Sequence, residues 1–124
     1  MPALKIAGGK VLARDLVIDR TRIFLGLMFR RKMDDDWALI LEPSKEGRHL
    51  VHTFFVSFPV DLVFTDSSMR VVEIKTNLNP WRLYLPRRRF AHLIELPGGK
   101  ISATGLRVGD KLVLEKVISM KLQK

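Results

Sequence analysis

The chain has 124 residues, and its composition already excludes several classes of protein. Hydrophobic residues make up 47% of the chain and charged residues 28%. These values exclude a disordered chain, because disordered chains lack the apolar side chains that offset the entropy of ordering. The absence of cysteine excludes disulfides, thiolate metal sites and a cysteine nucleophile. The length is typical of one domain, and we expect residues 1–124 to form a single domain.

The chain is strongly basic, with 22 Lys and Arg, 13 Asp and Glu, and a formal net charge of +9. Such a charge favours a polyanionic partner, although a basic surface can also serve solubility alone. No stretch approaches the roughly 18 uncharged apolar residues of a membrane helix. Met1 to Ala13 does not have the pattern of a signal peptide, because Lys5 and Lys10 interrupt its apolar residues. We therefore expect a cytoplasmic protein with no membrane partner.

Most of the chain predicts β-strands, because runs of β-forming residues alternate with clusters of Gly, Pro, Asp and Ser. The expected strands, in chain order, are Leu4 to Ala7, Asp15 to Ile18, Trp37 to Glu42, His49 to Phe58, Val60 to Thr65, Met69 to Lys75, Phe90 to Leu96 and Lys111 to Ile118. Asp66, Ser67 and Ser68 supply side-chain acceptors for a tight hairpin turn. The strand pattern predicts a mainly β fold, either an antiparallel β-sandwich or a distorted barrel.

One α-helix is expected to pack against these strands. The segment after Asp19 predicts it, because Asp19 can cap a first turn and the apolar residues that follow share one helical face. These apolar residues are Ile23, Phe24, Leu27 and Met28. A single helical turn is also predicted at Ile101 to Thr104, where Gly105 can supply a left-handed C-terminal cap.

Three blocks of sequence resemble a known family. They are "GLMFR" (Gly26 to Arg30), "FPVDLVF" (Phe58 to Phe64), and "ELPGG" (Glu95 to Gly99) followed by "GLRVGD" (Gly105 to Asp110). In this order and spacing, the chain resembles the family known as domain of unknown function 192 over nearly its whole length. The resemblance implies a jelly-roll-like β-sandwich or distorted barrel with one packed helix, and it implies no established reaction.

The chain departs from the family in one block. The family commonly has a polar run with a Trp before its Pro-x-Asp block, whereas this chain has "HTFFVSF" there, with His52 in place of the Trp. A site built on the polar version of this run is therefore not expected to carry over.

Pro59 and Asp61 interrupt an apolar strand pattern. Proline cannot donate a ladder hydrogen bond, so Pro59 marks a strand edge or a bulge. A carboxylate among apolar neighbours needs a partner, because an isolated buried charge is very costly. Asp61 can fulfil a structural role by accepting backbone amides at the bulge or by pairing with Arg30. It can alternatively line a functional pocket, and the sequence favours the structural role because it shows no partner nucleophile.

We expect a small-molecule binding module rather than an enzyme, with no catalytic residue and no cofactor. The net charge favours an anionic ligand, and the ligand-binding candidates are Arg30, His52, Asp61 and Glu95. A hydrolase in which Asp61 and Glu95 form a carboxylate pair is a weaker alternative, because such chemistry needs two carboxylates at a set separation. No metal site is expected, since His49 and His52 are three residues apart and would point to opposite faces of a strand.

The segment "NPWRLYLPRRRF", Asn79 to Phe90, supports a third hypothesis. It mixes arginines, which contact phosphates, with aromatic rings, which stack on bases, and this mixture suits single-stranded nucleic acid. The candidate residues are Trp81, Arg82, Tyr84, Arg87, Arg88 and Arg89. In the alternative interpretation the segment is a loop that packs Trp81 and Tyr84 inward and leaves its arginines solvated. Exposed edge strands would allow either a monomer or a homodimer.

Overall fold

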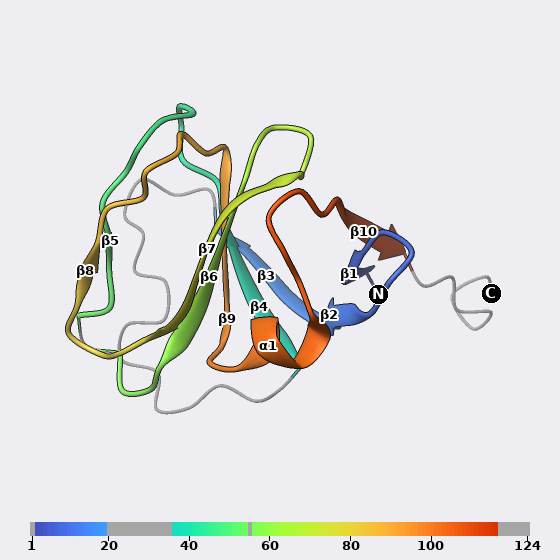
Figure 1. Ribbon diagram of the computed structural model, residues 1–124, viewed down its shortest axis with the longest axis horizontal. Helices are drawn as coiled ribbons and strands as arrows, with labels where there is room; N and C mark the ends of the chain where they lie inside the picture. The colour runs from blue at the N-terminus through green and yellow to red at the C-terminus, as the bar shows by residue number, and fades with distance from the viewer. Residues whose placement is uncertain (1, 20–35, 55, 117–124) are drawn as a thin grey trace.

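A computed structural model describes residues 2–19, 36–54 and 56–116 (Figure 1). This part of the chain is mainly β, with one short helix. The elements are β1 (Pro2–Ile6), β2 (Val11–Ala13), β3 (Asp15–Asp19), β4 (Trp37–Leu41), β5 (Val51–His52), β6 (Val60–Thr65), β7 (Val71–Leu78), β8 (Leu83–Tyr84), β9 (His92–Pro97), α1 (Lys100–Thr104) and β10 (Leu112–Lys116). The mainly β fold class predicted from the sequence is confirmed.

The described strands form three open sheets. A central sheet has the order β3-β4-β9-β6-β7, a second sheet has the order β10-β1-β2, and β5 pairs with β8 in a short ribbon. The pairing of β3 with β4 is parallel, and the other pairs of the central sheet are antiparallel. The β3–β4 pair is thus an exception to the antiparallel arrangement expected from the sequence. A parallel pair requires a long crossover, and residues 20–36 separate the two strands in the sequence.

The central sheet is covered on both faces (Figure 1). The three-stranded sheet and α1 lie on one side, and the β5–β8 ribbon lies on the other. Each face has its own hydrophobic cluster, and all six residues of β6 are buried between the two. Along β9, Ile94 and Leu96 belong to the first cluster, whereas Leu93 belongs to the second. This alternation follows from the two-residue period of a strand.

The predicted β6–β7 hairpin is present, and its turn is built around Asp66. Asp66 Oδ1 accepts hydrogen bonds from the backbone amides of Ser68 at 2.9 Å and Arg70 at 3.0 Å, and from the Ser68 hydroxyl. The hydrogen bond from the Arg70 amide, together with those from Ser68, lowers the pKa of Asp66. The side-chain acceptor identified in the sequence thus closes the turn.

The two predicted helical segments have different outcomes. The single turn near Ile101 is confirmed as α1, and Gly105 at φ 73° forms its left-handed cap, with its amide bonded to the Ile101 carbonyl at 2.9 Å. The longer helix predicted after Asp19 lies outside the described residues. No helix in the described part of the chain is long and apolar enough to cross a membrane.

The long strand predicted from His49 to Phe58 is wrong. Only Val51–His52 forms β5. Thr53 extends its pairing with the segment around β8: the Thr53 amide donates to the Arg82 carbonyl at 2.9 Å, and the Thr53 carbonyl accepts from the Trp81 amide at 2.9 Å. The chain then turns, because the Val56 amide also donates to the Thr53 carbonyl, at 3.2 Å. Neither β8 nor β2 was predicted from the sequence.

Candidate functional site

Asp61 is fully buried and holds three backbone amides. Its Oδ1 accepts from Asn77 at 2.8 Å and from Gly99 at 3.2 Å, and its Oδ2 accepts from Ile101 at 2.8 Å. Gly99 and Ile101 belong to the start of α1, where the N-cap residue has no side chain to serve as a cap. Asn77 lies on β7 opposite a register shift in β6. Asp61 therefore caps a helix and stabilises a β-bulge. This is the structural role, accepting backbone amides at the bulge, that the sequence predicts for it.

Two of the family-like blocks meet at this junction. The Gly98 amide donates to the Pro59 carbonyl at 3.2 Å. A Cβ atom at Gly98 would lie 2.7 Å from Asn77 Oδ1 and 3.1 Å from the Pro59 carbonyl oxygen, so only glycine fits without a shift. The Pro-x-Asp and Leu-Pro-Gly-Gly sequences thus form one structural unit, which gives them a role that needs no ligand.

Asp61 and Glu95 do not form a carboxylate pair. In the β6–β9 ladder, Asp61 is opposite Leu96 and Leu62 is opposite Glu95. Asp61 and Glu95 are thus offset by one residue, which places their side chains on opposite faces of the central sheet. The geometry that a hydrolase would require of these two carboxylates is absent.

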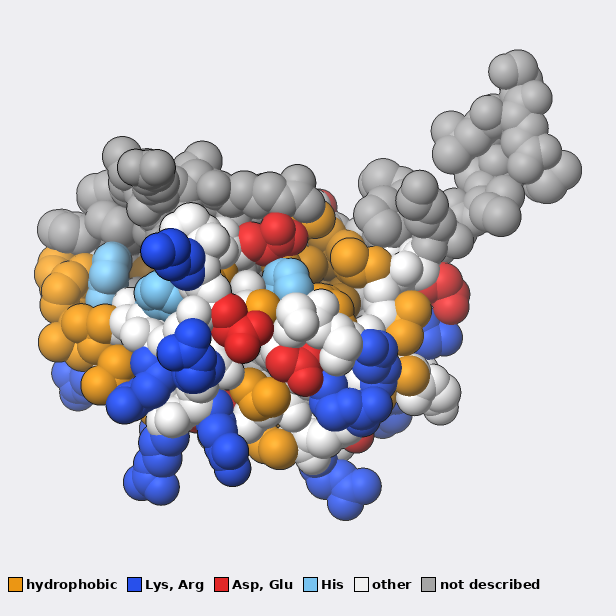
Figure 2. Space-filling view, turned by 90° about the horizontal axis from the view of Figure 1, so that it is seen from above, with side chains coloured by type: hydrophobic (Ala, Val, Ile, Leu, Met, Phe, Trp, Pro, Cys, Tyr) orange, Lys and Arg blue, Asp and Glu red, His pale blue; other side chains and the backbone are white. Residues whose placement is uncertain are grey.

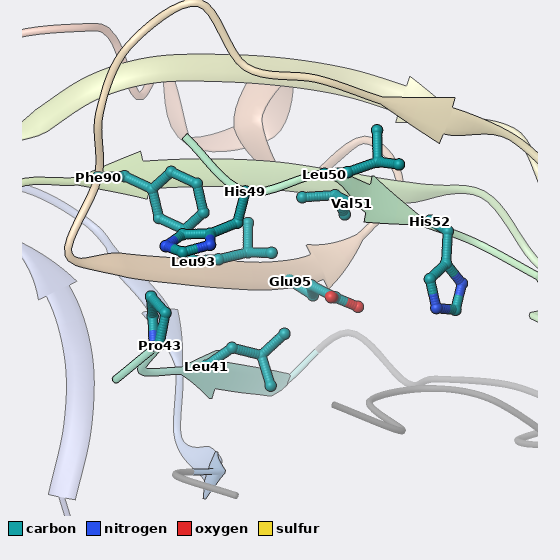
Figure 3. Close-up of a pocket in the computed structure, with 9 residues that line it drawn as sticks. All are labelled: Leu41, Pro43, His49, Leu50, Val51, His52, Phe90, Leu93 and Glu95. Carbon is teal, nitrogen blue, oxygen red and sulfur yellow. The ribbon is translucent and has the colours of Figure 1, made fainter. Parts of the chain in front are cut away.

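Glu95 lies instead in a pocket between the central sheet and the segment that leads into β5 (Figure 3). The pocket has a volume of about 200 Å³ and is mostly apolar. Its described lining residues are Leu41, Pro43, His49, Leu50, Val51, His52, Phe90, Leu93 and Glu95. Two of the four ligand-binding candidates, His52 and Glu95, therefore share one pocket. Asp61 faces away from it, and Arg30 lies outside the described residues.

Glu95 is only 7% exposed, and its carboxyl group makes no hydrogen bond within the described part of the chain. Figure 3 shows its carboxyl end reaching into the space between Leu41 and Val51. Burial raises the pKa of Glu95 to about 7. A carboxyl group with this pKa can donate a hydrogen bond as an acid or attract a cation as a carboxylate near neutral pH.

The histidines of the pocket have defined contacts. His49 Nε2 lies 2.8 Å from the Lys45 carbonyl oxygen, and the imidazole ring meets Phe90 edge-on. His52 Nδ1 accepts from the Phe54 amide at 3.2 Å, and the two rings stack. Among the described residues, no group of three or more His, Asp and Glu side chains is arranged to hold a metal ion. The sequence did not place His49 in a site with His52, because two residues three apart on the predicted strand would point to opposite faces.

In the Asn79 to Phe90 segment, some aromatic side chains pack into the core and others lie at the surface. Tyr84 packs against Phe64 with ring centroids 5.8 Å apart, and its hydroxyl donates to Glu73 Oε2. Burial, reinforced by Glu73, raises the pKa of Tyr84 to about 12. Glu73 Oε1 also accepts the amides of Arg87 and Arg88 at 2.8 and 2.9 Å. Tyr84 is therefore part of the structural framework, whereas Trp81 is 55% exposed.

The four candidate arginines of this segment, Arg82, Arg87, Arg88 and Arg89, are all exposed. The last three line a shallow hollow of about 570 Å³ together with Val71, Val72, Val108 and Gly109. The Arg89 guanidinium donates to the Glu46 carbonyl at 2.9 Å. Figure 2 shows that Lys and Arg side chains on the displayed face occur in several groups along its edge, with Asp and Glu nearer the middle.

These features define a small, mainly β protein whose mixed central sheet carries an apolar pocket with a buried carboxyl group. The chain belongs to the family described as an uncharacterised ACR, domain of unknown function 192, whose family model matches residues 5–114. The resemblance inferred from the three sequence blocks is thus confirmed. No function is established for this family.

Similar proteins occur in Pyrococcus species, and similar structures come from two other organisms. A UPF0127 protein of Pyrococcus horikoshii is 37% identical over 106 residues, which cover 84% of this chain and 86% of the relative. A UPF0127 protein of Pyrococcus furiosus is 38% identical over 97 residues, which cover 77% of this chain and 80% of the relative.

Two crystal structures share the fold. One, described as a candidate transcription regulator of Sinorhizobium meliloti, has a TM-score of 0.79 at 24% identity and covers 91% of this chain and 92% of its own. The other is a protein of unknown function from Novosphingobium aromaticivorans. It has a TM-score of 0.77 at 21% identity, and the match covers 90% of this chain and 83% of that protein's chain.

Proposed function

We propose that this protein is a binding module for a small, mostly apolar molecule that carries one basic amino group, held in the Glu95 pocket. One observation carries the proposal. Glu95 is a buried carboxyl group that faces an apolar pocket and has no hydrogen-bond partner in the described part of the chain. Because no fully buried side-chain oxygen of the described residues lacks a partner, the Glu95 oxygens are open to the pocket. A ligand that places a donor beside them would form a hydrogen bond in apolar surroundings, where it is stronger than in water.

A cationic amine is the best complement to this group. An ammonium group donates charge-assisted hydrogen bonds to a carboxylate, and the interaction is stronger in apolar surroundings than in water. The side chains of Leu41, Leu93 and Phe90 would contact an apolar tail. The pocket therefore combines an apolar lining with one placed polar group, as small-molecule sites commonly do.

The preference for an anionic ligand, based on net charge, remains a separate prediction. The described lining of the pocket contains no Lys or Arg, and its titratable groups are His49, His52 and Glu95. An anion would bind best when Glu95 is protonated, so its affinity would fall as the pH rises through about 7. A cationic amine would show the opposite dependence, because it requires the carboxylate.

A matched series of three small probes separates these possibilities. Butylamine, butanol and butyrate each contain four carbon atoms and carry a cationic, a neutral and an anionic head group, respectively. We expect butylamine to bind with a dissociation constant in roughly the millimolar range, as suits a fragment, and to bind more tightly at pH 8 than at pH 6. Amide and methyl chemical shifts of Leu41, Val51 and Leu93, followed by NMR during titration, would report the binding.

The substitution Glu95→Gln should remove the preference for the amine and its pH dependence, because the amide has no charge. Glu115→Gln is the matched control, since Glu115 is an exposed carboxylate on β10. Tighter binding of butyrate than of butylamine at both pH values would refute the proposal and support the anionic alternative. The nucleic-acid hypothesis concerns the surface around Trp81 and Arg82 and does not depend on Glu95.

A further inference from the structure

The outer face of the β5–β8 ribbon is unusually apolar for an exposed surface. Val51 pairs with Tyr84 and His52 pairs with Leu83 in the ribbon. Val51 and Tyr84 pack on the core, so His52 and Leu83 face outward. The large apolar side chains exposed on and beside this face are Leu50 at 59%, Trp81 at 55%, Leu83 at 56% and Leu85 at 52%. Grouped apolar side chains on a surface indicate an interaction site.

Three aromatic rings form a row on this face. The rings of His52 and Phe54 stack with centroids 5.0 Å apart and an interplanar angle of 30°. The rings of Phe54 and Trp81 follow at 5.8 Å and 33°. His52 and Trp81 are exposed. The described residues therefore place inclined aromatic rings at the surface of the molecule.

Thr53 holds the backbone beneath this row in place. Its hydroxyl donates to the Asn79 carbonyl at 2.7 Å and accepts from the Arg82 amide at 2.9 Å. Its own carbonyl accepts from the Trp81 amide at 2.9 Å. Trp81 adopts φ 61°, a left-handed conformation that is uncommon for a residue with a side chain. The bonds to Thr53 maintain this conformation, which presents the indole outward.

Positive charge accompanies the rings along the same segment. Arg82 follows Trp81 directly, and Arg87 and Arg88 follow Leu85. Arg87 and Arg88 line a shallow hollow with Leu85, Lys75 and other residues. Arg87 lies six positions after Trp81, which corresponds to at most about 20 Å of extended chain. A flexible polyanion with flat bases can follow a path of this length.

We propose that the outer face of the β5–β8 ribbon binds single-stranded nucleic acid, with bases stacking on Trp81 and the neighbouring rings and with Arg82, Arg87 and Arg88 contacting phosphates. Stacking on aromatic rings beside a basic surface is the common basis of sequence-tolerant binding to single strands. Tyr84 takes no part in the stacking, because its ring packs on Phe64 and its hydroxyl bonds to Glu73. The net charge of +9 favours a polyanion over an apolar protein segment as the occupant.

The test is binding of oligothymidylate and oligouridylate of about 12 nucleotides, measured by fluorescence anisotropy at about 50 and 200 mM salt. We expect Trp81→Ala to weaken binding about tenfold or more at both salt concentrations and to leave the salt dependence unchanged, because it removes stacking and no charge. The double substitution Arg87→Ala with Arg88→Ala should make the slope of log affinity against log salt shallower by about 1 to 2.

Two control variants match these changes outside the proposed surface. Leu114→Ala removes an exposed apolar side chain from β10, and Arg14→Ala removes an exposed positive charge between β2 and β3. Both should bind within about twofold of the unaltered protein. Absence of binding at 50 mM salt would overturn the proposal. So would equal affinities of the Trp81→Ala and Leu114→Ala variants, since binding would then involve no stacking on Trp81.

Discussion

At the scale of single residues, two buried carboxylates on neighbouring strands have opposite surroundings. Asp61 accepts three backbone amides, whereas Glu95 makes no hydrogen bond within the described part of the chain. Both are buried in the same central sheet, so the difference comes from which face each one occupies. One face offers the free amides at the start of α1, and the other offers an apolar pocket. Asp61 therefore stabilises the fold, and Glu95 lines the pocket.

The raised pKa of Glu95 predicts a specific dependence of stability on pH. Below about pH 4.5 the group is protonated in both the folded and the unfolded chain, so it contributes nothing. Between about 4.5 and 7 the unfolded chain loses the proton while the folded protein keeps it. The free energy of unfolding therefore falls as the pH rises, by a total on the order of 3 kcal/mol, and levels off above about 7.

Comparison with Glu95→Gln isolates this effect, since the amide does not titrate. Urea unfolding of both proteins between about pH 4 and 8 should give equal stabilities at the acid end and a more stable Gln variant at the alkaline end. Titratable groups distant from residue 95 contribute equally to both proteins and cancel in the difference. A difference in stability that stays constant across this range would show that Glu95 ionises normally in the folded protein.

At the scale of elements, Asp61 joins β6, β7 and α1 into one unit. The substitution Asp61→Asn keeps the shape of the side chain and replaces one acceptor oxygen with a donor group. At least one of the amides of Asn77, Gly99 and Ile101 then loses its partner in a buried position. We expect the free energy of unfolding to fall by roughly 1–3 kcal/mol, measured by chemical denaturation. Asp15→Asn is the control, because Asp15 is exposed and its change should stay within about 0.5 kcal/mol.

Hydrogen exchange would locate the effect of Asp61→Asn. Loss of protection should be greatest at the Ile101 and Gly99 amides, which mark the start of α1. A variant as stable as the unaltered protein, with unchanged protection of these amides, would mean that water replaces the carboxylate without cost.

The sequence predicted the elements whose signals are local. The strand Val60 to Thr65 was predicted with its observed bounds, because its apolar run ends at Pro59 and at the Asp66 turn. The Gly105 cap was also evident, since a left-handed residue after a short helix favours glycine. The His49 to Phe58 prediction failed because its run of β-forming residues reveals neither the turn in which the Val56 amide bonds to the Thr53 carbonyl nor the pairing of Thr53 with the distant Arg82. Local propensity cannot identify a partner almost thirty residues away.

The candidate sites were predictable to a similar degree. The local pattern around Pro59 and Asp61 gave the structural role of Asp61, and the basic-aromatic segment pointed to Trp81 and its arginines. The sequence does not reveal the register between β6 and β9. Asp61 and Glu95 were therefore placed in one candidate site, although they occupy opposite faces of the central sheet. The inward position of Tyr84 and the outward position of Trp81 depend on packing against Phe64 and on the Thr53 bonds, which the sequence does not encode locally.

At the scale of the whole molecule, the two hydrophobic clusters share the strands of one central sheet. Val63 belongs to the cluster beneath the three-stranded sheet, and Val60 belongs to the cluster beneath the β5–β8 ribbon. Both side chains are fully buried, and both extend from β6. Because each cluster is formed partly by this strand, neither can lose its packing without exposing β6 to water. Loss of either cluster should therefore disrupt the other.

This shared strand predicts cooperative unfolding of both layers. Val60→Ala and Val63→Ala each remove two methyl groups from a packed position, and each should lower the free energy of unfolding by about 1–3 kcal/mol. With Trp81 replaced by Phe so that Trp37 is the remaining tryptophan, two signals are compared. Fluorescence of Trp37, which lies in the second cluster, and far-ultraviolet circular dichroism, which reports all the strands, should give coincident transitions for both variants. If Val63→Ala shifted the dichroism transition and left the Trp37 transition in place, the two layers would be separate folding units and the expectation of a single domain would be wrong. Coincident shifts in both variants would show that the sheet bearing the Glu95 pocket and the layer bearing Trp81 fold together, so that a ligand bound at either place would stabilise the whole chain.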